Sequence, residues 1–121
     1  MVSADEVREF ALTLPRTELG WVRGSARYRI KQIVYAGVSR DEELMGFAFP
    51  KAEREGLVAA EPGKFQMPRE SDLRFNWVVG RLAAIDVDEM QELVLDAWTM
   101  CVPKGVDREF RLTHDWPLAT E

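Results

Sequence analysis

The feature that most constrains the fold is a strand-like run followed by an amphipathic helix, between residues 75 and 104. From Met90 to Cys101, apolar residues recur at i, i+3, i+4, i+7, i+8 and i+11, which is the spacing of one helix face. Asp86 can cap the first turn with its carboxylate. Pro103 should end the helix, because proline has no amide hydrogen to donate. The pattern predicts a helix that begins after Asp86 and packs one face on the rest of the protein.

The run before this helix predicts the strand. Trp77, Val78 and Val79 are residue types favoured in strands. Two large aromatic residues, Trp77 in the strand and Trp98 in the helix, are predicted to be core residues, since aromatic side chains at periodic positions usually pack inside. The alternative for either is a role in a binding site.

Shorter patterns fill the rest of the chain. Ser3 and Glu6 have the spacing of a capping box, and they precede a helix predicted from Ala4 to Leu14. Residues 15–24, which include Trp21, are predicted to be a loop. The further expected elements are a strand from Ala26 to Val38, a strand from Leu44 to Phe49, a short helix from Lys51 to Ala60 and a brief strand from Phe65 to Met67.

Helices at both ends with strands between them predict an α+β fold. We expect an antiparallel sheet of about four to five strands with the N- and C-terminal helices packed on one face. The 121 residues fit a single domain, with a core from about residue 4 to residue 104. In the extension 105–121, we expect Phe110, Leu112 and Trp116 to dock on the body.

Composition excludes several classes of protein. No apolar run approaches the ~20 residues that cross a bilayer, and the polar N-terminus does not resemble a signal peptide, so a cytoplasmic location without membrane contact is expected. One cysteine, Cys101, and one histidine, His114, give no basis for a metal site or a Cys–His nucleophile. Neither common phosphate-binding loop motif occurs. We therefore expect no cofactor and no enzymatic activity.

Charge is distributed unevenly along the chain. The net charge is −5, yet the segment 15–35 carries five cationic residues and one acid, Glu18, so +5 − 1 = +4. If residues 26–38 form one strand, Arg27, Arg29 and Lys31 project from the same side about 7 Å apart, close to the spacing of phosphates along a nucleic-acid strand. The candidate site consists of Arg23, Arg27, Arg29 and Lys31, with Trp21 placed to stack on a base. The alternative is a solvated face whose arginines pair with nearby acids.

Several segments resemble the MmcQ/YjbR family of small bacterial proteins. The similar segments are Ala-Leu-Thr-Leu-Pro at 11–15, Tyr-Arg-Ile-Lys at 28–31, Val-Tyr-Ala-Gly-Val at 34–38, Asn-Trp-Val-Val at 76–79 and the helix at 86–104. Asn76 stands where the family has a histidine, and Ala97-Trp98 stands where it has Ser-Tyr.

The resemblance implies a CyaY-like or secretion-chaperone-like α/β sandwich, without a cofactor or known catalytic residues. It also implies DNA binding. Two hypotheses follow. The first is a small bacterial DNA-binding protein of the MmcQ/YjbR type, without enzymatic activity, that binds weakly and without sequence specificity through the basic strand face. The second is a protein-interaction or adaptor domain, in which a face with basic and aromatic side chains takes a partner peptide.

Overall fold

The computed structural model describes residues 1–114, including the side chains of all but 111, 113 and 114. It has the predicted α+β architecture, an antiparallel sheet packed against helices, although the sheet contains six strands. The elements are α1 (Ala4–Ala11), β1 (Thr17–Val22), β2 (Ser25–Ile30), β3 (Ile33–Val38), β4 (Leu44–Ala48), α2 (Arg54–Ala60), β5 (Phe65–Gln66), η1 (Glu70–Asp72), β6 (Trp77–Arg81), η2 (Leu82–Ala84), α3 (Val87–Cys101) and α4 (Val106–His114).

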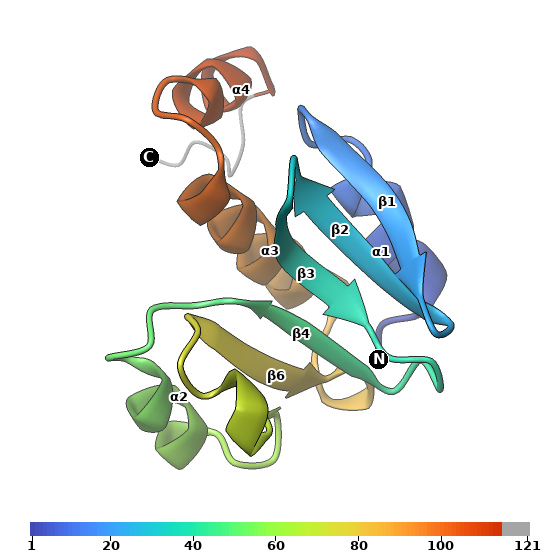
Figure 1. Cartoon of the computed structure of the whole chain (residues 1–121), viewed down its shortest axis with the longest axis vertical. Helices are drawn as coiled ribbons and strands as arrows, with labels where there is room; N and C mark the ends of the chain where they lie inside the picture. The colour runs from blue at the N-terminus through green and yellow to red at the C-terminus, as the bar shows by residue number, and fades with distance from the viewer. Residues whose placement is uncertain (115–121) are drawn as a thin grey trace.

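The strands lie in the order β1-β2-β3-β4-β6-β5, and every neighbouring pair is antiparallel. The central pair, β3 and β4, is joined only where Ala36–Val38 pair with Met45–Phe47. Beyond that short ladder the two strands diverge, so the β1–β2–β3 ribbon turns away from β4 and β6 (Figure 1). This divergence opens the sheet on the side away from the helices.

Helices α1 and α3 cover one face of the sheet and lie behind it in Figure 1. The predicted cap of α3 is confirmed, because Asp86 Oδ1 accepts a hydrogen bond from the Glu89 amide at 2.8 Å. Trp98 is fully buried between the helix and the sheet, and its indole Nε1 donates to the Pro15 carbonyl at 2.9 Å. Trp98 is a core residue as predicted, whereas Trp77 is only half-buried and lies on the other face of the sheet.

Helix α1 has the predicted capping box. The Glu6 amide donates to Ser3 Oγ at 3.1 Å, and the Ser3 amide donates to Glu6 Oε1 at 2.9 Å. The helix ends at Ala11 instead of Leu14, because the chain tightens into i→i+3 hydrogen bonds from the Thr13 and Leu14 amides. Leu14 is nevertheless buried, so the predicted apolar stripe is intact.

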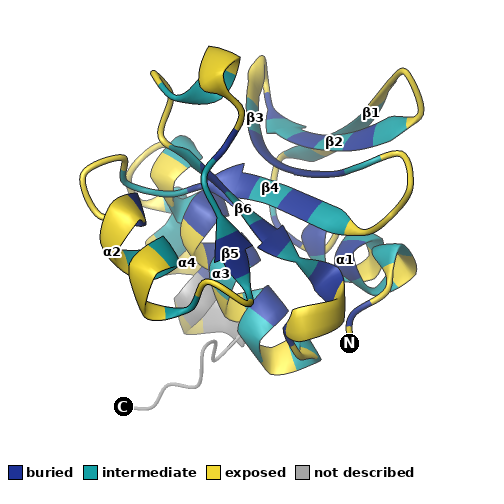
Figure 2. Ribbon diagram, turned by 90° about the horizontal axis from the view of Figure 1, so that it is seen from below, coloured by how far each residue is buried: buried dark blue, intermediate teal, exposed yellow. Residues whose placement is uncertain are grey.

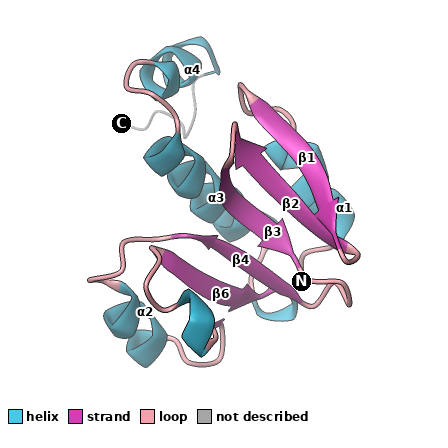
Figure 3. Ribbon diagram, in the orientation of Figure 1, coloured by secondary structure: helices cyan, strands magenta, loops and turns pink. Residues whose placement is uncertain are grey.

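Two predictions for residues 15–38 are wrong. The expected loop contains β1, and the expected single strand is split into β2 and β3 (Figure 3). Both hairpins turn on residues with positive φ: Arg23 at 51° with Gly24 at 85°, and Lys31 at 57°. Arginine and lysine are uncommon in this left-handed region. Neither turn has the Asn-Gly or Asp-Gly sequence that usually marks a tight hairpin, so the sequence did not predict these two turns.

The segment after α3 is helical rather than an irregular tail. Gly105, with φ of 102°, precedes α4, and the Phe110 ring packs edge-on against Trp98 with centroids 5.3 Å apart. Phe110 therefore docks as expected, but Leu112 is 79% exposed, so its predicted docking is wrong. Trp116 lies outside the described residues. Across residues 1–114, no helix combines the length and apolar character of a membrane span.

Candidate nucleic-acid interface

The face of the sheet opposite α1 and α3, called the outer face below, carries the two central residues of the predicted basic site. Along β2 the residues alternate between intermediate and buried (Figure 2). Ala26, Tyr28 and Ile30 are buried on the helix side, and alternation therefore places Arg27 and Arg29 on the outer face.

The other two cations of the predicted site lie elsewhere. Arg23 is in the β1–β2 turn and Lys31 is in the β2–β3 turn, at opposite ends of β2. Six residues of strand separate these turns by roughly 20 Å. The predicted row of three cations from one strand is thus reduced to Arg27 and Arg29, with Lys31 beyond the end of the strand.

The two outer-face arginines differ in their partners. Arg29 Nε lies 3.6 Å from Glu18 Oε1, and these residues are directly opposite each other in the β1–β2 ladder. Arg27 has no ion pair with any described residue, since its cross-strand neighbours are Gly20 and Gly37. The alternative of a neutralised surface therefore applies to Arg29 and does not apply to Arg27.

Trp21 lies on the helix side of the sheet. It pairs with Ala26, whose side chain is buried against the helices, and its ring stacks on the Arg8 guanidinium of α1 with the carbon 5.5 Å from the centroid. Trp21 is 57% exposed, but it does not share a surface with Arg27. The structure therefore does not bring it together with the outer-face arginines.

A groove of about 980 Å3 lies on the outer face where β3 and β4 diverge. Its floor contains two glycines that face each other across the strands, Gly37 and Gly46. A Cβ at Gly46 would lie 2.6 Å from the Trp77 ring, and one at Gly37 would lie 3.4 Å from Arg27 Cδ. The indole and the arginine stem thus lie directly over the backbone of the floor, which requires glycine at position 46.

The wall of the groove opposite Arg27 is held by a buried arginine. Arg54 of α2 is only 6% exposed, and its guanidinium donates to the carbonyls of Leu73, Phe75 and Trp77, the last two at 2.8 and 3.2 Å. These bonds fix the backbone that carries Phe75, which is 50% exposed, and Trp77, which is partly buried.

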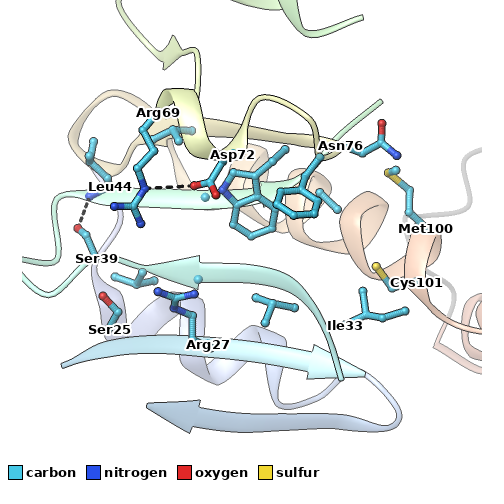
Figure 4. A pocket seen from close by; sticks show the side chains of 18 of the residues that line it. Ser25, Arg27, Ile33, Ser39, Leu44, Arg69, Asp72, Asn76, Met100 and Cys101 are labelled. Atoms are coloured by element: carbon cyan, nitrogen blue, oxygen red, sulfur yellow. Dashed lines mark hydrogen bonds and ion pairs between the residues drawn. The ribbon is translucent and has the colours of Figure 1, made fainter. Parts of the chain in front are cut away.

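The charge that lines the groove is positive, although the protein is acidic. Arg27 rises from one side, and Arg69 lies across from it, paired with Asp72 at 3.2 Å (Figure 4). These three residues sum to +2 − 1 = +1, against −5 for the chain. The groove thus combines aromatic surface with cationic side chains.

Cys101 lies at the α3 end of the groove, beside Met100 (Figure 4). Burial raises the pKa of the Cys101 thiol, which keeps it protonated and unreactive at neutral pH. Within residues 1–114, no three His, Cys, Asp or Glu side chains come close enough to hold a metal ion.

Sequence reasoning missed the aromatic part of this site. The available signal was the pair of glycines inside predicted strands, Gly37 and Gly46, because a strand glycine often marks the close approach of another group. Trp77 was predicted to be a core residue, with a binding-site role as the alternative, because the run around it shows no alternation that would assign it to one face.

Comparison with known proteins gives a likeness in fold. No protein-family model and no curated protein matches this sequence. The structure of Deinococcus radiodurans protein DR2400, which has a DUF419 domain, is similar with a TM-score of 0.72 over 93% of this chain and 88% of that chain. The two sequences are 16% identical, so the chain shares its fold with a DUF419 protein.

Proposed function

We propose that this protein is a non-enzymatic, MmcQ/YjbR-type nucleic-acid-binding protein that binds weakly and without sequence specificity through the outer face. One observation carries the proposal: Arg27, a cation without an ion pair to any described residue, lies across a groove from the aromatic side chains of Phe75 and Trp77, on the face opposite α1 and α3. The sequence resemblance supports the family assignment. Cationic side chains supply most of the affinity in non-specific binding, and aromatic rings add stacking on bases.

The same charges limit the strength of binding. Arg27 and Arg29 are successive residues on the outer face of β2, and Arg69 lies across the groove from Arg27. Few phosphates can therefore be contacted at once, and the net charge of −5 repels the rest of a long polyanion. We expect measurable affinity at low salt and a steep loss as salt is added.

Reversal of the two outer-face charges tests the proposal. We expect Arg27→Glu with Arg29→Glu to lower affinity for a fluorescein-labelled 20-mer by about 10-fold or more in anisotropy titrations at low salt. The matched control, Lys104→Glu with Arg108→Glu, makes the same change in net charge in and before α4 and should retain most of the affinity. Absence of binding by the natural protein to both single-stranded and duplex DNA at low salt would refute the proposal.

A second candidate, a protein-interaction domain, is favoured by the divergence of β3 from β4. The first residues of β3, from Ile33, have no pairing with β4. Three apolar residues that line the groove are exposed: Ile33 by 55%, Phe75 by 50% and Met100 by 44%. An extended peptide could add to such an edge. A peptide-display selection against the protein, counter-selected on Ile33→Glu, should then enrich peptides that bind only the natural chain, and a selection without enrichment would count against this function.

A further inference from the structure

We infer that the groove holds a single unstacked nucleobase, flat against the Trp77 indole, with its attached phosphate on Arg27. This inference rests on the proposed nucleic-acid binding and assigns it a substrate class, nucleotides whose base is free of a partner strand. It follows from the shape of the glycine floor, from the position of the indole and from the charge at the rim.

The floor belongs to a row of paired residues that runs across four strands, and the two middle residues are glycines. Arg27 pairs with Gly37, Gly37 with Gly46, and Gly46 with Val79. The two middle positions have no side chain, and three strand spacings place the backbones of Arg27 and Val79 about 14 Å apart. The Trp77 ring and the Arg27 stem lie against these two glycines, so the groove above them can admit a flat ring that larger side chains at 37 and 46 would exclude.

Trp77 provides a stacking surface in this groove. Atoms of its indole lie 2.6 to 2.8 Å from where a Cβ of Gly46 would be, so the ring lies against the floor on one side. Because Trp77 is only half-buried and lines the groove, its other side is available to a ligand. Bases of any sequence stack on such a ring, since every base has a π face.

The charges at the rim suit the phosphate of the same nucleotide. The Arg27 stem runs over Gly37, with Cδ and Nε 3.4 and 3.9 Å from its Cβ position, and the guanidinium has no ion pair within the described chain. Guanidinium groups bind phosphate oxygens with two parallel hydrogen bonds. In a duplex, bases are stacked and paired, and therefore only single-stranded or free nucleotides can present a base to Trp77.

Three ligands and three variants test the inference. The ligands are a labelled 12-mer of oligothymidylate, a duplex of the same length, and thymidine monophosphate as competitor. The variants are Gly46→Ala, whose Cβ would displace the indole, Trp77→Leu, which removes it, and the control Gly56→Ala, whose Cβ meets nothing within 4 Å. We expect the single strand to bind at least ~10-fold more tightly than the duplex and to lose about that factor in the first two variants.

The outcomes separate this inference from the proposed function. Competition by the monophosphate at similar concentration would identify free nucleotides as the source of the base, and absence of competition would identify the strand. Equal affinity for single strand and duplex, unchanged in Gly46→Ala and Trp77→Leu, would overturn the inference and leave phosphate binding intact. No binding of any ligand would remove both. If Gly46→Ala does not fold, as judged by near-ultraviolet circular dichroism, Trp77→Leu decides, because it adds no atom to the floor.

Discussion

At the scale of single residues, Arg54 connects stability with the candidate site. Its buried guanidinium donates hydrogen bonds to three backbone carbonyls and forms no ion pair with a carboxylate among residues 1–114. Replacement by alanine leaves those acceptors without donors, and an unsatisfied buried polar group costs more than the hydrogen bond contributes. We predict that Arg54→Ala lowers the free energy of unfolding by about 2–4 kcal/mol, measured by urea denaturation.

The control for this prediction is Arg81→Ala. Arg81 also donates from its guanidinium to a carbonyl, that of Pro62 at 3.0 Å, but in an exposed position. Water can replace it there, so we expect a loss below about 1 kcal/mol. Equal losses in the two variants would show that the burial of Arg54 does not matter.

At the scale of elements, the sequence predicted best where a structure depends on local signals. The caps at Ser3 and Asp86 and the apolar stripe of α3 are set within one or two turns, and all of them are found in the structure. The sequence did not predict the turns at Arg23 and Lys31. Their positive φ angles belong to hairpins whose strands pair along their length, and nothing in the residue types at the turns signals this.

The candidate site shows the same difference between features set by local sequence and features set by the pairing of distant strands. Alternation along β2 predicted that Arg27 and Arg29 share a face, which needs only neighbouring residues. It did not predict that Trp77 lies over Gly46, nor that Trp21 faces α1, since both depend on the order in which distant strands pair.

The Phe110 side chain connects helix α4 to the core. Phe110 is 6% exposed and packs on Trp98, whereas Leu112, two residues later, is 79% exposed. We predict that Phe110→Ala lowers the opening free energy of α4 by about 3 kcal/mol, seen as faster amide hydrogen exchange in residues 106–114 with little change in β2–β4. Leu112→Ala should leave exchange unchanged. Faster exchange across the sheet in Phe110→Ala would mean that α4 is part of the global folding unit.

At the scale of the whole molecule, the arrangement of charge matters more than its sum. The chain carries −5, yet Arg27 and Arg29 lie together on the outer face, where Glu18 pairs with Arg29. Removal of that carboxylate both lowers the net negative charge and frees a guanidinium beside Arg27. These two effects can be separated, because an acid on α3 changes the net charge without touching the outer face.

We therefore predict that Glu18→Gln strengthens single-strand binding and steepens its salt dependence. One additional phosphate contact should change the slope of log affinity against log salt by about −0.7, measured by anisotropy titrations between low and physiological salt. Glu92→Gln makes the same change in net charge on an exposed position of α3 and should leave the slope unchanged. If both variants gain affinity equally, binding follows the total charge, and Arg29 makes no contact of its own. If only Glu18→Gln gains affinity, the pair Arg27 and Arg29 is the place where phosphates bind.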